Sequence, residues 1–222
     1  MTIAKPAVWK TAYLAVIISS GILVVLASAR DLSATGYGLR WLVLAGLTIV
    51  GGFAQLRLPN MAASFSISDS FTIAAALLFG PAAGALAVVI DSLAISFQLA
   101  TRTFGLRRLL FNATAPALAM WVAAHGFFVL AGVGPLAESE TSLAGLLGPL
   151  MVFAGLYFVL NTGLIAGAIA FERRTAPFDI WRRHFLSLWL TYFGGAVVAA
   201  LLIALVNSRG DDLMVFALIA PI

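Results

Sequence analysis

The sequence predicts an all-α membrane protein: a polytopic helix bundle with about seven full spans, a truncated eighth and one interrupted half-helix hairpin. Three observations support this prediction. Of the 222 residues, 62% are hydrophobic and only 10% are charged, far from the usage of soluble domains. The mean hydropathy is +1.06, and the apolar residues form runs of roughly the 20 residues that a helix needs to cross a bilayer. The lysines and arginines fall in the short segments between these runs.

The apolar runs are separated by short connections with turn residues, such as Gly80-Pro81. We expect the seven full spans at about residues 11–29, 41–56, 60–79, 82–100, 109–132, 143–171 and 185–206. A further run starts at Leu213 and covers only about 15 Å as a helix, or half a bilayer. One interpretation is that this end lies flat on the outer surface of the membrane. We expect instead that the native chain continues past Ile222, completes this span and enters a cytoplasmic domain.

The first run, residues 11–29, has two interpretations. Ala27-Ser28-Ala29 resembles a signal-peptidase site after a short basic N-terminal segment, so the run could be a signal peptide. The run is long for a signal peptide, and we interpret it as an anchor helix added to a single transmembrane domain that covers residues 1–222. The orientation of the remaining spans is the same in both cases.

The distribution of basic residues predicts the orientation, because Lys and Arg prefer cytoplasmic loops. With the N-terminus in the cytoplasm, only Arg30, Arg40 and Arg209 fall outside. Ten basic residues then fall on the cytoplasmic side: Lys5, Lys10, Arg57, Arg102, Arg107, Arg108, Arg173, Arg174, Arg182 and Arg183. The sequence thus predicts a multi-pass protein of the cytoplasmic membrane with its N-terminus inside the cell.

Two aspartates occur within the apolar hairpin that turns at Gly80-Pro81. Asp69 lies eleven residues before Gly80, and Asp91 lies eleven residues after it. If both arms are helical, the two acids lie at one depth, about 16 Å from the turn. This depth is close to the middle of a hydrocarbon core about 30 Å thick, where carboxylates are costly and usually functional.

The first arm of this hairpin is not expected to be helical throughout. Residues 64–68 alternate between serine and apolar residues, and this period of two favours extended backbone. Ser68 is then expected at the N-cap of a helix, because serine is favoured at that position, and Asp69 is expected in the first turn. The sequence therefore predicts a half-helix that begins near the middle of the membrane, an arrangement that forms small-ligand sites in transporters.

Further polar residues occur in the neighbouring spans. Gln98 follows Asp91 at a spacing of seven, so both are expected on one small and polar face that looks inward. Asn112 lies four residues before Pro116, which cannot donate a hydrogen bond to the Asn112 carbonyl and leaves it free for a partner. Asn161 is the only amide side chain of its span.

The candidate ligand-binding residues are therefore Ser68, Asp69, Asp91, Gln98, Asn112 and Asn161. A structural role is the alternative for each of them. Asp69 would then only start a helix, Asp91 would be buried and protonated, and the two asparagines would join helices with about 0.6 kcal/mol each.

Other kinds of site have little support in the sequence. The chain has no cysteine, which excludes disulfides, thiolate catalysis and Cys-ligated metals. We find no P-loop, HExxH spacing or Ser-His-Asp arrangement, and we predict no catalytic residue, no metal, no cofactor and no nucleic-acid partner. Residues 171–185, "FERRTAPFDIWRRHF", are interpreted as a basic cytoplasmic loop, with contact to anionic lipids as the alternative.

Three segments resemble a known family. "SISDSFTIAAALLFGPAAGAL", "RRLLFNATAPALA" and "YFVLNTGLIAGAIAFERR" are similar to the vitamin-uptake-like membrane sensor domain of bacteria. That domain precedes cyclic-di-GMP enzymes or histidine kinases and is similar to the S components of energy-coupling-factor transporters. The resemblance covers roughly residues 40–222 and carries over to Asp69, Gly80, Pro81, Asn112 and Asn161, whereas Asp91 rests on the depth argument.

The resemblance implies a sensory domain of the bacterial inner membrane that binds a small molecule or ion. It would signal to a cytoplasmic diguanylate cyclase or HD phosphohydrolase, and any homodimer is expected to form through that output domain. The first alternative is an S-component-like subunit of a vitamin or small-molecule transporter. Such subunits often carry Ala-xxx-Ala in their first helix, whereas this chain has Ala15-xxx-Ser19. The second alternative is a structural membrane protein without a ligand.

Overall fold

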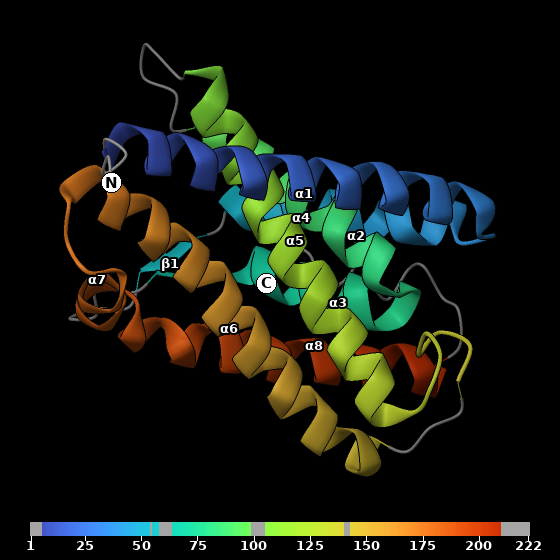
Figure 1. Ribbon diagram of the computed structural model, residues 1–222. Coiled ribbons are helices and arrows are strands. Elements are labelled where there is room, and N and C mark those ends of the chain that lie inside the picture. The colour runs from blue at the N-terminus through green and yellow to red at the C-terminus, as the bar shows by residue number, and fades with distance from the viewer. Residues whose placement is uncertain (1–5, 54, 58–63, 99–104, 140–142, 210–222) are drawn as a thin grey trace.

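The structure is a computed structural model that describes residues 6–53, 55–57, 64–98, 105–139 and 143–209. Figure 1 shows a bundle of helices and one short two-stranded ribbon within these ranges. The helices are α1 Pro6–Ala34, α2 Gly38–Phe53, α3 Ile67–Phe79, α4 Pro81–Gln98, α5 Leu106–Ala131, α6 Leu143–Arg173, α7 Pro177–His184 and α8 Trp189–Arg209, with a 3-10 turn at Leu186–Leu188 before α8. In the ribbon, β1 (Gln55–Arg57) pairs antiparallel with β2 (Ser64–Ser66).

Four helices of the described chain, α1, α5, α6 and α8, are long and apolar enough to cross a membrane. The chain is thus that of a helical membrane protein, but the four long helices are fewer than the seven full spans predicted. α2, α3 and α4 are shorter apolar helices. α2 and α3 are short because part of each apolar run forms a strand of the ribbon instead of helix. The run from Leu213 lies outside the described residues.

The extended backbone predicted within residues 64–68 is present as β2, and the half-helix α3 follows it directly. The predicted N-cap at Ser68 was wrong. α3 begins at Ile67, so Ser68 lies in the first turn and its hydroxyl is not at the capping position. It forms a hydrogen bond with the side chain of Asp91 instead.

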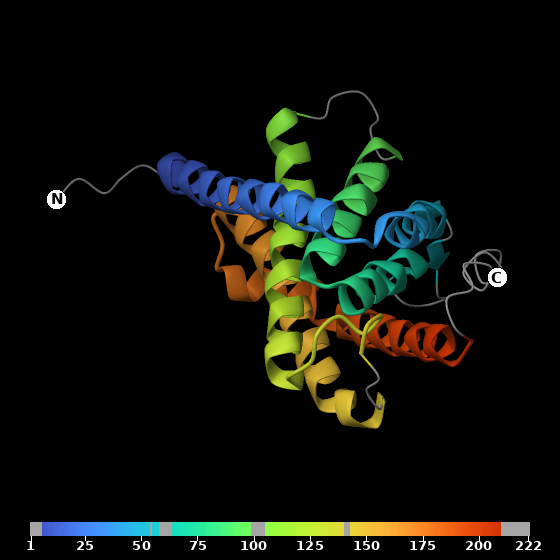
Figure 2. The ribbon, with the colours of Figure 1, turned by 90° about the vertical axis from the view of Figure 1, so that its right-hand side faces the viewer.

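α3 lies at the centre of the bundle, where α2, α4 and α8 pack around it. Residues 70–80 are all buried, and alanines 74–76 allow the neighbouring helices to approach closely. In Figure 2, α1 lies above and α8 below these central helices, so the two long helices form opposite edges of the bundle. Their exposed side chains include many large hydrophobic residues, as expected for contact with lipid.

The hairpin between α3 and α4 turns where the sequence predicted. Gly80 has a φ of +96°, which favours glycine, and Pro81 is the first residue of α4. Next to the turn, a Cβ atom at Gly84 would overlap the side chain of Ala76. The two arms therefore pack closely, and residues equally far from Gly80 come to lie opposite each other.

The connections between helices gather at two ends of the bundle. At the left end in Figure 1, the ammonium group of Lys10 lies 3.8 Å from the carboxylate of Glu172. The guanidinium of Arg107 donates a hydrogen bond to the Thr11 carbonyl at 3.5 Å. The N-terminus of α1, the N-terminus of α5 and the C-terminus of α6 therefore share one end.

The opposite end is formed by the α1–α2 turn and the segment after α5. The Tyr37 hydroxyl donates a hydrogen bond to Glu138 Oε1 at 2.7 Å, and the Leu136 amide donates to the Leu77 carbonyl at 3.0 Å. Burial and the neighbouring Glu138 carboxylate raise the pKa of Tyr37 to about 12. The α1–α2 turn and the segment after α5 therefore share this end of the bundle.

Candidate functional site

The α3–α4 hairpin brings the two aspartates together inside the bundle. Asp69 and Asp91 lie close enough to interact electrostatically, which agrees with the equal depth expected from their spacing. The Ser68 side chain forms a hydrogen bond with the Asp91 carboxylate. Asp91 is only 8% exposed.

α6 and α8 complete this group with an amide and two phenols. Asn161 Nδ2 on α6 donates a hydrogen bond to the Tyr192 hydroxyl on α8 at 2.7 Å. The Tyr192 ring packs edge to face against the ring of Tyr157, with 5.2 Å between the ring centroids. Both tyrosines interact electrostatically with Asp69. Four helices, α3, α4, α6 and α8, therefore contribute side chains to one polar cluster.

Two glycines leave space beside the carboxylates. A Cβ atom at Gly195 of α8 would lie 3.8 Å from Asp69 Cβ and 3.9 Å from Ser70 Oγ. A Cβ atom at Gly52 of α2 would lie 3.4 Å from Asp91 Oδ1. These are ordinary contact distances, so each glycine leaves a gap about as large as a methyl group next to a polar side chain.

The cluster contains buried oxygens without a hydrogen-bond partner. Among the described residues, four buried side-chain polar atoms lack one: Ser28 Oγ, Ser70 Oγ, Asp91 Oδ1 and Asn161 Oδ1. Three of these four belong to the polar cluster. Most buried polar groups in proteins are paired, and an unpaired one costs about 1–3 kcal/mol. The unpaired oxygens are therefore the feature of this cluster that needs a physical explanation.

The structure also shows which candidates lie elsewhere. Ser68, Asp69, Asp91 and Asn161 belong to the cluster. Asn112 is partly buried on α5, and none of the described hydrogen bonds connects it to the cluster. Gln98 is the last residue of α4, and its side chain lies outside the described part of the chain.

Sequence reasoning missed Ser70, Tyr157 and Tyr192. A signal was present for Tyr157, which precedes Asn161 by four residues and so lies on the same face of its helix. Tyr192 had a weaker signal, a phenol in an otherwise apolar run. Ser70 belongs to the first turn of the half-helix, next to Asp69.

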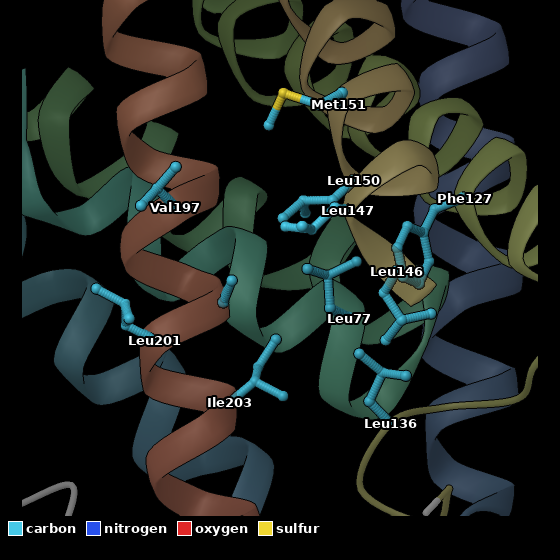
Figure 3. A pocket seen from close by; sticks show the side chains of 11 residues that line it. Leu77, Phe127, Leu136, Leu146, Leu147, Leu150, Met151, Val197, Leu201 and Ile203 are labelled. Atoms are coloured by element: carbon cyan, nitrogen blue, oxygen red, sulfur yellow. The ribbon is translucent and has the colours of Figure 1, made fainter. Parts of the chain in front are cut away.

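An apolar cavity of about 220 Å³ lies between α6 and α8, beyond the cluster (Figure 3). Leu77 belongs to its lining and is two helical turns from Asp69 on the same face of α3. The buried Ile73 lies between them. Leu147 and Leu201, also in the lining, are exposed. The cavity therefore opens at the outer surface of the bundle and is separate from the polar cluster.

Aromatic contacts connect the cluster to α7. The Phe158 ring lies 5.4 Å from the Tyr192 ring and 5.6 Å from the Trp181 ring, measured between centroids. Trp181 Nε1 donates a hydrogen bond to Thr162 Oγ1 on α6 at 2.8 Å. The interpretation of residues 171–185 as a loop was therefore incomplete, because they include a short helix that docks on α6.

Comparisons of the chain with protein-family models, with curated proteins and with solved structures find no match.

Proposed function

We propose that the protein is a membrane-embedded sensory domain that binds a small molecule or ion at the polar cluster and signals to a cytoplasmic output such as a diguanylate cyclase or HD phosphohydrolase. One observation carries this proposal. The buried oxygens of Ser70, Asp91 and Asn161 come from three of the helices that form the polar cluster, and none of the three has a hydrogen-bond partner in the described chain. The resemblance of the hairpin and of the two asparagine-containing segments to bacterial sensor domains supports the choice of a sensor.

The proposal includes seven membrane crossings, with the N-terminus on the cytoplasmic side of the bacterial inner membrane. The 16 residues of α2 cover about 24 Å, and β1 adds about 10 Å. The 13 residues of α3 cover about 20 Å, and β2 adds about 10 Å. α4, with 18 residues, covers about 27 Å. Each length is near the thickness of the hydrocarbon core, about 30 Å. The excess of Lys and Arg on the side of the N-terminus supports the orientation.

The proposed signal passes from the cluster to α7. A ligand that binds the Asn161 side chain alters the hydrogen bond that Asn161 donates to the Tyr192 hydroxyl. The Tyr192 ring contacts the Phe158 ring. Phe158 in turn packs against Trp181 of α7. A ligand shifts this packing only if it binds two arrangements of the helices with different affinity.

The test is a ligand screen on the purified full chain in nanodiscs, with thermal unfolding followed by tryptophan fluorescence. Neutral, anionic and cationic metabolites would be added separately. A compound that binds the folded state at 100 times its Kd stabilises it by about 2.7 kcal/mol. We expect at least one compound to raise the unfolding temperature of the parent and to lose most of this effect with Ser70→Ala.

Ser28→Ala is the matched control. Like Ser70, Ser28 is 0% exposed and its hydroxyl has no partner, but it lies on α1, which contributes nothing to the cluster. Its ligand response should equal that of the parent. Equal responses of both serine variants to every stabilising compound would show that the cluster is structural, and would favour the reading of a membrane protein without a ligand at this place.

A further inference from the structure

We propose that α7 and the end of α6 form a surface that binds anionic phospholipid headgroups of the bilayer around the protein. Two pairs of exposed arginines carry this surface: Arg173 and Arg174 at the end of α6, and Arg182 and Arg183 on α7. Within the described ranges, no hydrogen bond or ion pair engages these four side chains. The surface is separate from the polar cluster, and lipid binding there does not depend on the proposed function.

One face of α7 is fixed to the protein, which leaves the opposite face for a partner. Ile180 is buried and packs against α6. Trp181 Nε1 donates a hydrogen bond to Thr162 of α6. Arg182 and Arg183 follow directly, and because successive helical residues turn by about 100°, both point away from this face and are exposed.

α7 lies across the direction of the long helices. Figure 1 shows α7 nearly end-on at the left end of the bundle, whereas α1 and α8 run across the picture. The stretch that is apolar enough to cross a membrane begins at Leu186, two residues after the end of α7. α7 therefore lies where a membrane-crossing segment starts, with the orientation of a helix in the plane of the interface.

Exposed apolar side chains beside the arginines suit such an interface. Phe178 is 65% exposed, and its ring stacks on the Trp181 ring with 6.2 Å between the centroids. Phe178 precedes Arg182 by four residues and so lies on the same side of α7. In interfacial helices the aromatic ring enters the acyl boundary while the basic group reaches the headgroups. The exposed Leu186 and Trp189 continue this apolar surface toward α8.

The turn after α6 places a charge where glycine is the usual residue. Arg174 has a φ of +56°, and the Thr175 amide donates a hydrogen bond to the Ala170 carbonyl at 3.1 Å. This is the geometry of a Schellman turn, in which glycine is preferred because a side chain is strained in the left-handed conformation. An interaction of the Arg174 side chain with an anionic partner accounts for the arginine at this position.

The charges of this surface select an anionic partner with phosphate oxygens. Glu172 lies beside Lys10, at 3.8 Å, and Asp179 lies in the first turn of α7, where the helix dipole favours an acid. No acid in the described part of the chain forms an ion pair with the four arginines. A guanidinium group donates hydrogen bonds in a planar fork that fits phosphate. Anionic phospholipids supply phosphates at the level of the interface.

The experiment measures how much spin-labelled lipid the purified full chain holds in phosphatidylcholine membranes. The readout is the ratio of the association constants of spin-labelled phosphatidylglycerol and phosphatidylcholine. We expect a ratio above one that falls as the salt concentration rises. Arg182→Gln and Arg183→Gln should each lower the ratio, by up to about fivefold. Arg30→Gln removes an exposed arginine near the opposite end of α1 and, as the matched control, should leave the ratio unchanged.

Arg174→Gly separates lipid binding from a structural role. Glycine relieves the strain of the left-handed turn, so this variant should resist unfolding in SDS mixed micelles at least as well as the parent. Its lipid ratio should nevertheless fall. A ratio of one in the parent, or an unchanged ratio in all three variants of this surface, would overturn the proposal, and a surface that serves a protein partner would give this result. An equal fall with Arg30→Gln would also overturn it, because the attraction would then belong to any exposed arginine.

Discussion

Replacing Gly84 with alanine should destabilise the protein by about 1–3 kcal/mol, because the new methyl group has no space between the arms of the hairpin. A Cβ atom at this position would overlap the Ala76 side chain and lie 2.8 Å from Ala76 Cα. Carbon atoms in ordinary contact are about 3.5–4.0 Å apart. The obstruction is backbone, so α3 and α4 must separate by about 1 Å, and this also moves Asp69 away from Asp91.

The measurement is equilibrium unfolding in mixed micelles of a mild detergent and SDS, followed by tryptophan fluorescence. Gly195→Ala is the matched control. A Cβ atom there would meet Ile73 Cδ1 at 3.4 Å and Asp69 Cβ at 3.8 Å, which needs no movement. We expect this variant to be as stable as the parent or up to about 1 kcal/mol more stable, because alanine is the better helix former.

Unfolding of Gly84→Ala at the same SDS fraction as Gly195→Ala would refute this prediction. Close packing of α3 against α4 would then not hold the hairpin, and the facing positions of Asp69 and Asp91 would need another explanation.

Three further predictions concern other parts of the chain. Single cysteines at Glu138 and Pro177 should react with an impermeant reagent from opposite sides of the membrane; labelling of position 177 from outside intact cells would overturn the proposed topology. Trp181→Phe removes the hydrogen bond to Thr162, so it should cost about 0.5–1.5 kcal/mol in unfolding experiments; unfolding at the same SDS fraction as the parent would show that this hydrogen bond does not stabilise the contact of α7 with α6. The pKa of Tyr37 is raised from 10.0 to about 12, so neutral Tyr37 contributes its full stability below pH 10 and this contribution is lost as the pH rises through about 12. The melting temperature of Tyr37→Phe should therefore fall less than that of the parent between pH 10 and pH 12. Equal falls would refute the assignment.

Local sequence determined the membrane character, the apolar runs and the shape of the central hairpin. The turn was predictable because glycine tolerates the positive φ that a turn requires, whereas proline fixes φ at a value suited to the first residue of a helix. The strand before α3 was predictable because residues 64–68 alternate with a period of two. The pairing of Asp69 with Asp91 followed from their equal distance to the turn, since both arms rise at nearly the same rate near it.

Only the tertiary structure decided which other side chains reach the two acids. Asn161 and Tyr192 are 31 positions apart, and their contact depends on how α6 and α8 pack, which no local pattern encodes. Asn112 looked equivalent to Asn161 in the sequence, but its place on α5 gives it no described link to the cluster. Periodicity fixes the face of a helix that a residue occupies, whereas the partner across that face is set by side-chain packing between helices distant in the chain.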